Sequence, residues 1–209
     1  MNQRESEGEY TKLNDISIDN LEGVISMAYH KGKSFLETFG GNACDVCFFA
    51  VDVNYNDDTK SYETEDFGGF YLDSGVSSCF LTYLFEKYYN PNMKYNRELY
   101  GPWADVFDWN GNFLFSYEQI RKICSEIEHA LHLFKCDYYN PELDAIKRSF
   151  SIYSMCDKTD PDYINGNNDD NSYKRHLNVI LEFYEGFLSI MQATLSENPN
   201  QNFIEVSGP

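Results

Sequence analysis

The chain has 209 residues and a formal net charge of −18, from 34 acidic and 16 basic side chains. This balance repels phosphate backbones and anionic lipids, so it argues against direct binding of nucleic acid or of a membrane. Hydrophobic residues make up 42% of the chain and aromatic residues 17%, which supplies enough apolar surface for a core and excludes a disordered protein.

The length favours a single domain over residues 1–209, with two small domains as the alternative. Residues 1–15 are polar and predict a loosely held N-terminal arm. This start has no apolar segment of the kind a secretory signal needs, and no stretch reaches the ~18 apolar residues of a membrane span. We therefore expect a cytosolic, cytoplasmic protein whose six cysteines are reduced thiols.

The first part of the chain predicts a helix, a helical turn and the strongest strand of the sequence. Apolar residues at helical spacing predict a helix from Ile18 to about His30, and a short turn from Ser34 to Phe39. The stretch from Val46 to Tyr55 is β-branched and aromatic. Its continuous apolar start is typical of a strand that is buried on both faces.

After a turn at residues 56–60, an antiparallel partner strand is expected over residues 61–64 or residues 67–72. Gly68-Gly69 predicts a bulge in the second of these segments. A helix capped by Ser77 or Ser78 should then run to about Tyr89. The polar, tyrosine-bearing stretch at residues 92–100 is expected to be a loop.

The turn dipeptide Asn110-Gly111 predicts a hairpin over residues 103–115. Ser116 and Gln119 have the spacing of a capping box, which predicts the start of a helix that runs to about Cys136. Asn140-Pro141 predicts the start of another helix, because proline suits the first helical turn.

The last part of the chain predicts an exposed acidic loop at residues 157–171 and a long helix from Ser172 to about Ser196. The apolar arc of this helix is too wide for one neighbour to cover, so the helix should be central. Residues 203–206 predict a short strand. The expected architecture is α+β, with four or five helices packed on a small, mainly antiparallel sheet around the C-terminal helix.

Two patterns suggest metal or redox chemistry only weakly. Glu126, His129 and His132 have the Glu-x-x-His spacing of a di-metal helix, but no second copy of the motif exists, and a solvated helix face is the better interpretation. Cys44 and Cys47 form an isolated Cys-x-x-Cys, whereas a zinc site needs a second pair of ligands. We therefore expect no cofactor and no metal.

Carboxylates interleaved with aromatic residues gather in three predicted turns or loops. These partner-binding candidates are Asp57, Asp58, Glu63, Glu65 and Asp66; Asp105, Asp108 and Trp109; and Asp157, Asp160, Asp162, Asp169 and Asp170. Charges of one sign steer a partner of opposite charge, and aromatic side chains anchor the contact. The alternative is an acidic surface that only keeps the protein soluble.

These features favour a non-enzymatic binding protein that neutralises a basic protein partner, such as a nuclease or another nucleic-acid-binding protein. Toxin-immunity proteins and phage counter-defence inhibitors provide the analogy. The alternative is an enzyme of unrecognised type, assisted by a metal if Glu126, His129 and His132 turn inward. A structural subunit of a larger assembly is a third hypothesis.

Overall fold

The computed structural model describes residues 33–42 and 44–209, and residues 33–209 form one compact unit. The predicted N-terminal arm and the predicted helix from Ile18 to His30 lie outside the described residues. The expected α+β class is confirmed, because helices pack on a four-stranded antiparallel sheet. None of the helices described is long and apolar enough to cross a membrane.

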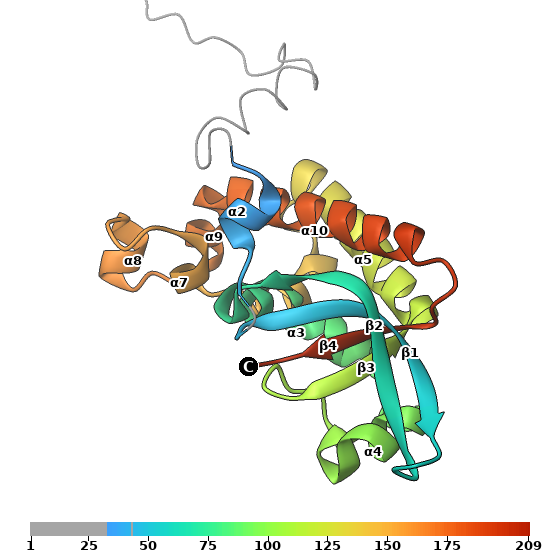
Figure 1. The fold of residues 1–209 in the computed structure, drawn as a ribbon. Helices are drawn as coiled ribbons and strands as arrows, with labels where there is room; N and C mark the ends of the chain where they lie inside the picture. The colour runs from blue at the N-terminus through green and yellow to red at the C-terminus, as the bar shows by residue number, and fades with distance from the viewer. Residues whose placement is uncertain (1–32, 43) are drawn as a thin grey trace, which may run out of the picture. The chain divides into compact units, whose positions relative to one another are not determined.

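The sheet contains β1 (Val46–Asn56), β2 (Ser61–Leu72), β3 (Asn112–Ser116) and β4 (Phe203–Ser207), in the spatial order β2-β1-β4-β3. Strand β4 comes from the end of the chain and lies between β1 and β3, with both of which it pairs antiparallel (Figure 1). The two segments predicted as alternative partners of β1 form one continuous strand. The C-terminal tail therefore completes the centre of the sheet.

The predicted bulge is present in β2. Ala50 pairs with Gly68 and Val51 pairs with Asp66, so Phe67 is the extra residue. Gly68 has a φ of 134°, a backbone conformation that residues with a Cβ rarely adopt. Beyond this bulge the hairpin of β1 and β2 continues to the turn at residues 57–60.

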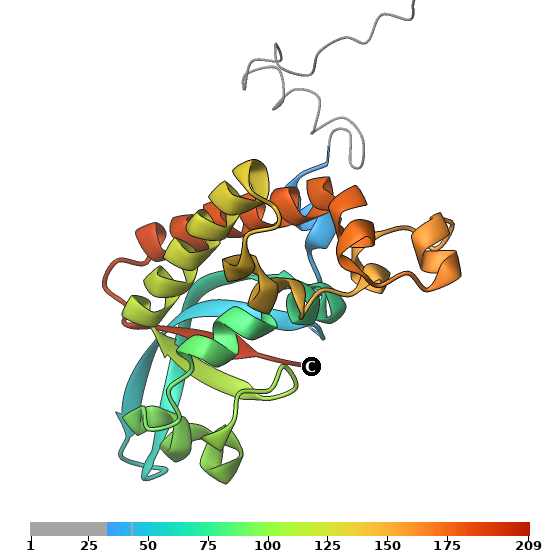
Figure 2. The ribbon, with the colours of Figure 1, turned by 180° about the vertical axis from the view of Figure 1, so that it is seen from behind.

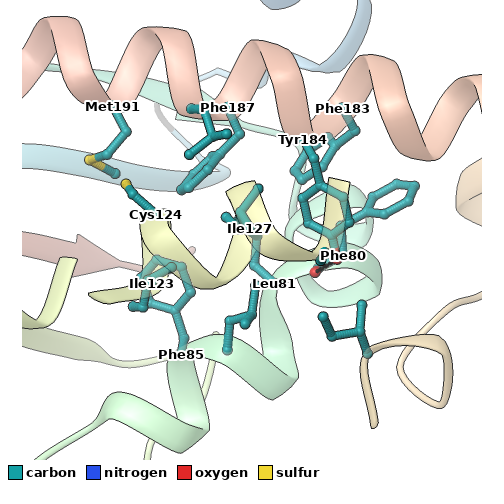
Figure 3. Packing of buried hydrophobic residues seen from close by; sticks show 14 of the residues in the cluster. Phe80, Leu81, Phe85, Ile123, Cys124, Ile127, Phe183, Tyr184, Phe187 and Met191 are labelled. Carbon is teal, nitrogen blue, oxygen red and sulfur yellow. Dashed lines mark hydrogen bonds between the residues drawn. The ribbon is translucent and has the colours of Figure 1, made fainter. Parts of the chain in front are cut away.

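Three long helices cover one face of the sheet: α3 (Ser74–Tyr88), α5 (Tyr117–Cys136) and α10 (Leu177–Glu197). Figure 3 shows apolar side chains of all three meeting in one cluster. Phe187 of α10 reaches the sheet, where its ring centroid lies 5.8 Å from that of Phe48. The predicted capping box of Ser116 and Gln119 is present at the start of α5. The cap of α3 is Asp73, four residues before the first predicted cap Ser77, and it accepts a hydrogen bond from the Val76 amide.

The helix predicted from Ser172 is in fact two helices, α9 (Asp170–Arg175) and α10. They meet at His176, whose φ of −101° and ψ of 20° end one helix and begin the next. The cap of α9 is Asp169, which accepts hydrogen bonds from two backbone amides. Tyr173 and Leu177 keep the apolar spacing across the junction, so the periodicity does not reveal the break.

The opposite face of the sheet is covered by α4 (Lys94–Tyr100), in the segment that was expected to be a loop. Asn96 is fully buried, and its amide pairs with both the N–H and the C=O of Leu114, at 2.7 and 3.2 Å. A polar residue at the centre of the buried face hides the helical pattern. The predicted hairpin at residues 103–115 is also wrong. Asn96 occupies the free edge of β3, and the segment that was expected to pair there includes the 3-10 helix η2 (Gly101–Asp105) instead of a strand.

Short helices complete the fold, and they correct the expectation of an exposed loop at residues 157–171. The helix predicted at Asn140-Pro141 is a 3-10 turn followed by a single α-helical turn. The remaining short elements are α2 (Phe35–Phe39), η3 (Pro141–Leu143), α6 (Asp144–Lys147), α7 (Ile152–Met155) and α8 (Pro161–Asn165). Asp160 caps α8 and Asp162 is buried, so part of the acidic stretch is structural.

Candidate protein-interaction surface

The densest acidic segment is the end of the β1–β2 hairpin, residues 52–66, which we call the acidic hairpin. Its side chains include six carboxylates and a single basic group, that of Lys60. Five of the six are the predicted candidates Asp57, Asp58, Glu63, Glu65 and Asp66, and all five are exposed. Figures 1 and 2 show the turn of the hairpin projecting away from α5 and α10.

Like charges face each other on one side of the acidic hairpin. Asp52 of β1 lies directly opposite Glu65 of β2, and Asn54 lies opposite Glu63. Carboxylates at directly opposed positions destabilise a sheet, because their Cβ atoms are only ~5 Å apart. Among the residues that the structure describes, no basic side chain forms an ion pair with Asp52, Glu63 or Glu65. This side of the hairpin therefore carries negative charge that the fold itself does not neutralise.

Amide side chains keep the carboxylates in place without neutralising them. Asn56 donates to both carboxylate oxygens of Glu63, at 2.9 and 3.0 Å, and Asn54 donates to Glu65 at 3.4 Å. Thr59 in the turn donates a further bond to Glu63 at 3.1 Å. Neutral donors fix the direction of a carboxylate and leave its charge available to another molecule.

The acidic side of the hairpin borders an open hollow of about 620 Å³ at the start of α5. Asp52 and Glu118 both line it, and Glu118 also pairs with Lys122 at 2.6 Å. Burial and the nearby Asp52 raise the pKa of the Tyr117 hydroxyl, while Arg121 acts in the opposite direction. Asp52 and Tyr117 therefore both border this hollow.

The other side of the acidic hairpin is aromatic. The ring of Tyr55 contacts that of Tyr62, which in turn contacts that of Tyr95 on α4, with both centroid distances at 5.2 Å. Lys94 lies over the Tyr62 ring at 5.4 Å. Tyr55 remains 51% exposed at the end of this row, so the hairpin offers a partly exposed aromatic ring beside its carboxylates.

In the second predicted cluster, Trp109 does not reach the surface as a docking residue would. Its ring centroid lies 4.8 Å from that of Phe107, and its indole N–H donates to Thr82 at 2.7 Å. Asp105 forms an ion pair with Arg97 at 2.6 Å, and Asp108 caps the turn by accepting from the Asn110 amide. This cluster mainly stabilises its own segment.

The exposed tryptophan is Trp103, which sequence reasoning missed. It is 86% exposed on η2, and the nearby Val106 is 73% exposed. Both line an open hollow of about 830 Å³ next to α4. Two large apolar side chains thus lie exposed beside this hollow. The proline in Gly101-Pro102-Trp103 was the available signal, since it favours a turn that presents the next side chain outward.

The third predicted cluster is mostly engaged in contacts within the fold. Asp169 is exposed and caps α9, and Asp170 pairs with Lys147 at 3.0 Å. Asp162 is buried and accepts from Arg175 at 2.8 Å, and the Arg175 guanidinium and Asn167 amide hold its pKa well below the usual range. Asp157 is exposed and is engaged by Thr159 within its own turn.

The weak metal candidates on α5 are not brought together. Glu126 accepts hydrogen bonds from Lys87 and Tyr88, at 2.6 and 2.7 Å, while His129 pairs with Glu142 at 2.8 Å. His132 is exposed, as expected for a solvated helix face. Within the described part of the chain, the three do not form a group of ligand atoms close enough for one ion.

The Cys-x-x-Cys motif gives no reactive pair. Cys44 is exposed, whereas Cys47 is half-buried on β1 opposite Ser207. Burial raises the pKa of the Cys47 thiol above its usual value, so this group stays protonated at neutral pH. A protonated thiol is a poor nucleophile.

A half-buried carboxylate lies under α4, at Glu205 of β4. Burial raises its pKa above the usual value, although Tyr100 and Thr64 lie beside it and favour the charged form. The folded state therefore binds this proton more tightly than the unfolded state does. The stabilisation is complete below the unfolded pKa and is lost as the pH rises through the folded pKa.

We expect Glu205→Gln to raise the melting temperature at pH 7, because the amide removes the desolvation of a charged group. The gain should vanish near pH 4, where the carboxyl is protonated in both states (unfolded pKa about 4.3). Thermal unfolding at the two pH values checks this. The control is Glu98→Gln, at an exposed position on α4. A lower melting temperature at pH 7 would show that the charged carboxylate is the form the fold prefers.

Comparison with protein-family models, with curated proteins and with solved structures finds no match for this chain.

Proposed function

We propose that this chain is a non-enzymatic binding protein that docks its acidic hairpin onto a basic surface of a partner protein. The observation that carries the proposal is the opposition of Asp52 and Glu65 without a basic neighbour in an ion pair. A fold gains nothing from facing carboxylates, which cost about 0.2–1 kcal/mol relative to a neutral pair. Lysine or arginine side chains of a partner would turn this repulsion into attraction.

The charge of the chain also selects the class of partner. A net charge of −18 disfavours nucleic acid and favours a basic protein. Basic clefts are typical of nucleases and other proteins that bind phosphate backbones. In this mechanism the carboxylates of the hairpin occupy such a cleft and exclude the phosphates, as a toxin-immunity protein or a phage counter-defence inhibitor in the cytoplasm would do.

Apolar contacts would hold the complex once charge has brought it together. Tyr55 is half exposed at the tip of the acidic hairpin, and Trp103 is exposed on η2, directly after the helix α4 that packs on β2. Tryptophan and tyrosine are the side chains that most often dominate the binding energy of protein interfaces. The carboxylates would thus speed association, and the exposed aromatic side chains would slow dissociation.

The proposal predicts that neutralising the hairpin removes binding without harming the fold. We expect Asp52→Asn/Glu63→Gln/Glu65→Gln to lose at least ~10-fold in capture of a basic protein from lysate of the native host. The amides keep the shape of the side chains, and relief of the Asp52–Glu65 repulsion should keep the variant at least as stable as the parent. Affinity capture with quantitative mass spectrometry, beside thermal unfolding, measures both.

A matched control separates the hairpin from the overall charge. The triple variant Glu86→Gln/Glu128→Gln/Asp137→Asn changes the net charge by the same amount at exposed positions on α3, at α5 and just after it. It should capture the partner as the parent does. Equal loss in both triple variants would mean that only net charge matters, and equal capture by all three proteins would refute a role for the hairpin.

A further inference from the structure

A second cluster of reactive side chains lies apart from the acidic hairpin, where the short helices meet the start of α10. Cys156 follows the last turn of α7, Asp160 caps α8, and His176 joins α9 to α10. Figure 1 shows α7, α8 and α9 gathered beside the N-terminal end of α10. Three segments that are separate in the chain thus place a thiol, a carboxylate and an imidazole at one point.

The spacing of the ligand atoms fits one small cation. One ligand atom from each of Cys156, Asp160 and His176 lies within 4.8 Å of the other two. The His176 Nε2 atom is 3.6 Å from Asp160 Oδ1 and 3.3 Å from Asp162 Oδ2. Two ligands of a tetrahedral zinc ion, each bound at about 2.1 Å, are about 3.4 Å apart. The Asp160 carboxylate and the imidazole are therefore already close to the spacing of two ligands of one tetrahedral ion.

The chemistry of the set selects the metal. A thiol, an imidazole and a carboxylate form the mixed sulfur, nitrogen and oxygen set that suits Zn²⁺, whereas Ca²⁺ and Mg²⁺ take oxygen ligands. His176 is 3% exposed, so the imidazole lies inside the protein. The neighbouring Asp162 accepts hydrogen bonds from the Arg175 guanidinium and the Asn167 amide, so its carboxylate is already engaged beside the cluster.

We propose that Cys156, Asp160 and His176 bind one Zn²⁺ ion, with a water molecule as the fourth ligand. The ion would tie α7, α8 and the junction of α9 with α10 together. Helices of four to six residues have little stability of their own, because a short helix does not repay the cost of its first turn. A structural zinc ion supplies the missing free energy in regions of this kind.

The test uses Co²⁺ as a spectroscopic substitute for Zn²⁺ in the full, untagged chain, after removal of metals with a chelator under reducing conditions. We expect binding of about one ion per chain, with a thiolate-to-cobalt charge-transfer band and intense visible bands of a tetrahedral site. Added Zn²⁺ should displace the cobalt and abolish both signals, whereas excess Mg²⁺ should not. Zn²⁺ should also raise the melting temperature of the stripped protein.

Cysteine variants identify the ligand. Cys156→Ser should lose the charge-transfer band and weaken cobalt binding more than ~100-fold, since even loss of an outer partner costs 10–100-fold. Cys136→Ser, which alters an exposed thiol at the end of α5, should bind as the parent does. If Cys156→Ser does not fold, Asp160→Asn should weaken cobalt binding while it keeps the charge-transfer band. Absence of the band in the parent protein, or its loss only in Cys136→Ser or Cys44→Ser, would overturn the proposal.

Discussion

Replacement of Phe187 by alanine should lower the free energy of unfolding by about 3–5 kcal/mol. Phe187 is fully buried on α10, and its ring lies between those of Phe48 on β1, Phe70 on β2 and Phe85 on α3. One side chain of α10 thus contacts three elements that lie far from α10 in the sequence. Since a domain is stable by only about 5–15 kcal/mol, this loss should lower the melting temperature by ~10 °C or more.

Urea unfolding followed by tryptophan fluorescence measures this effect. The matched control is Trp103→Ala, because Trp103 is 86% exposed and its removal should change stability by less than ~0.5 kcal/mol. If Phe187→Ala does not fold, Phe187→Leu should fold with a smaller loss. A cost under ~1 kcal/mol for Phe187→Ala would show that α10 is not packed on the sheet as described.

Replacement of Asn96 by alanine should lower the free energy of unfolding by about 2–6 kcal/mol, although it removes no apolar contact of note. The Asn96 amide satisfies both backbone groups of Leu114 on the edge strand β3. Without it, a buried N–H and a buried C=O lose their partners, at ~1–3 kcal/mol each. The open edge would also be free to pair with another chain, so the variant should aggregate more readily.

Thermal unfolding and light scattering of the variant check both effects. Asn92→Ala, in the exposed segment before α4, is the matched control and should behave as the parent does. An Asn96→Ala protein of parental stability would mean that water replaces the amide at Leu114. In that case β3 would not depend on α4 for the pairing of its outer edge.

The sequence predicted the elements whose signals are local. The β-branched and aromatic residues of β1, the capping box of α5 and the apolar spacing of α10 each lie within one segment, and the structure contains all three elements. Helix α4 was missed because its central inward residue is polar. Asn96 is buried there because its amide pairs with the backbone of β3, a contact that the sequence of α4 does not show. The break at His176 was missed because its side chain lies next to Asp160 and Asp162, far back in the chain.

In the candidate sites too, the sequence predicted local features and missed those that depend on tertiary contacts. The acidic hairpin was predictable, since a turn between two strands must be exposed and its charges are adjacent in sequence. Trp109 is half-buried against Phe107 whereas Trp103 is exposed, and this difference depends on tertiary packing. The zinc ligands proposed above have no motif spacing, because they come from three different helix ends.

The acidic hairpin is the centre of this account, and the rate of its association with the captured basic protein is the most direct test. We expect the association rate constant of the parent to fall steeply as the ionic strength rises, because salt screens charges beyond about 10 Å at 0.1 M. The Asp52→Asn/Glu63→Gln/Glu65→Gln variant should associate more slowly at low salt and show a flatter dependence. Identical rates and identical salt dependence for the two proteins would contradict the claim that the hairpin recognises the partner.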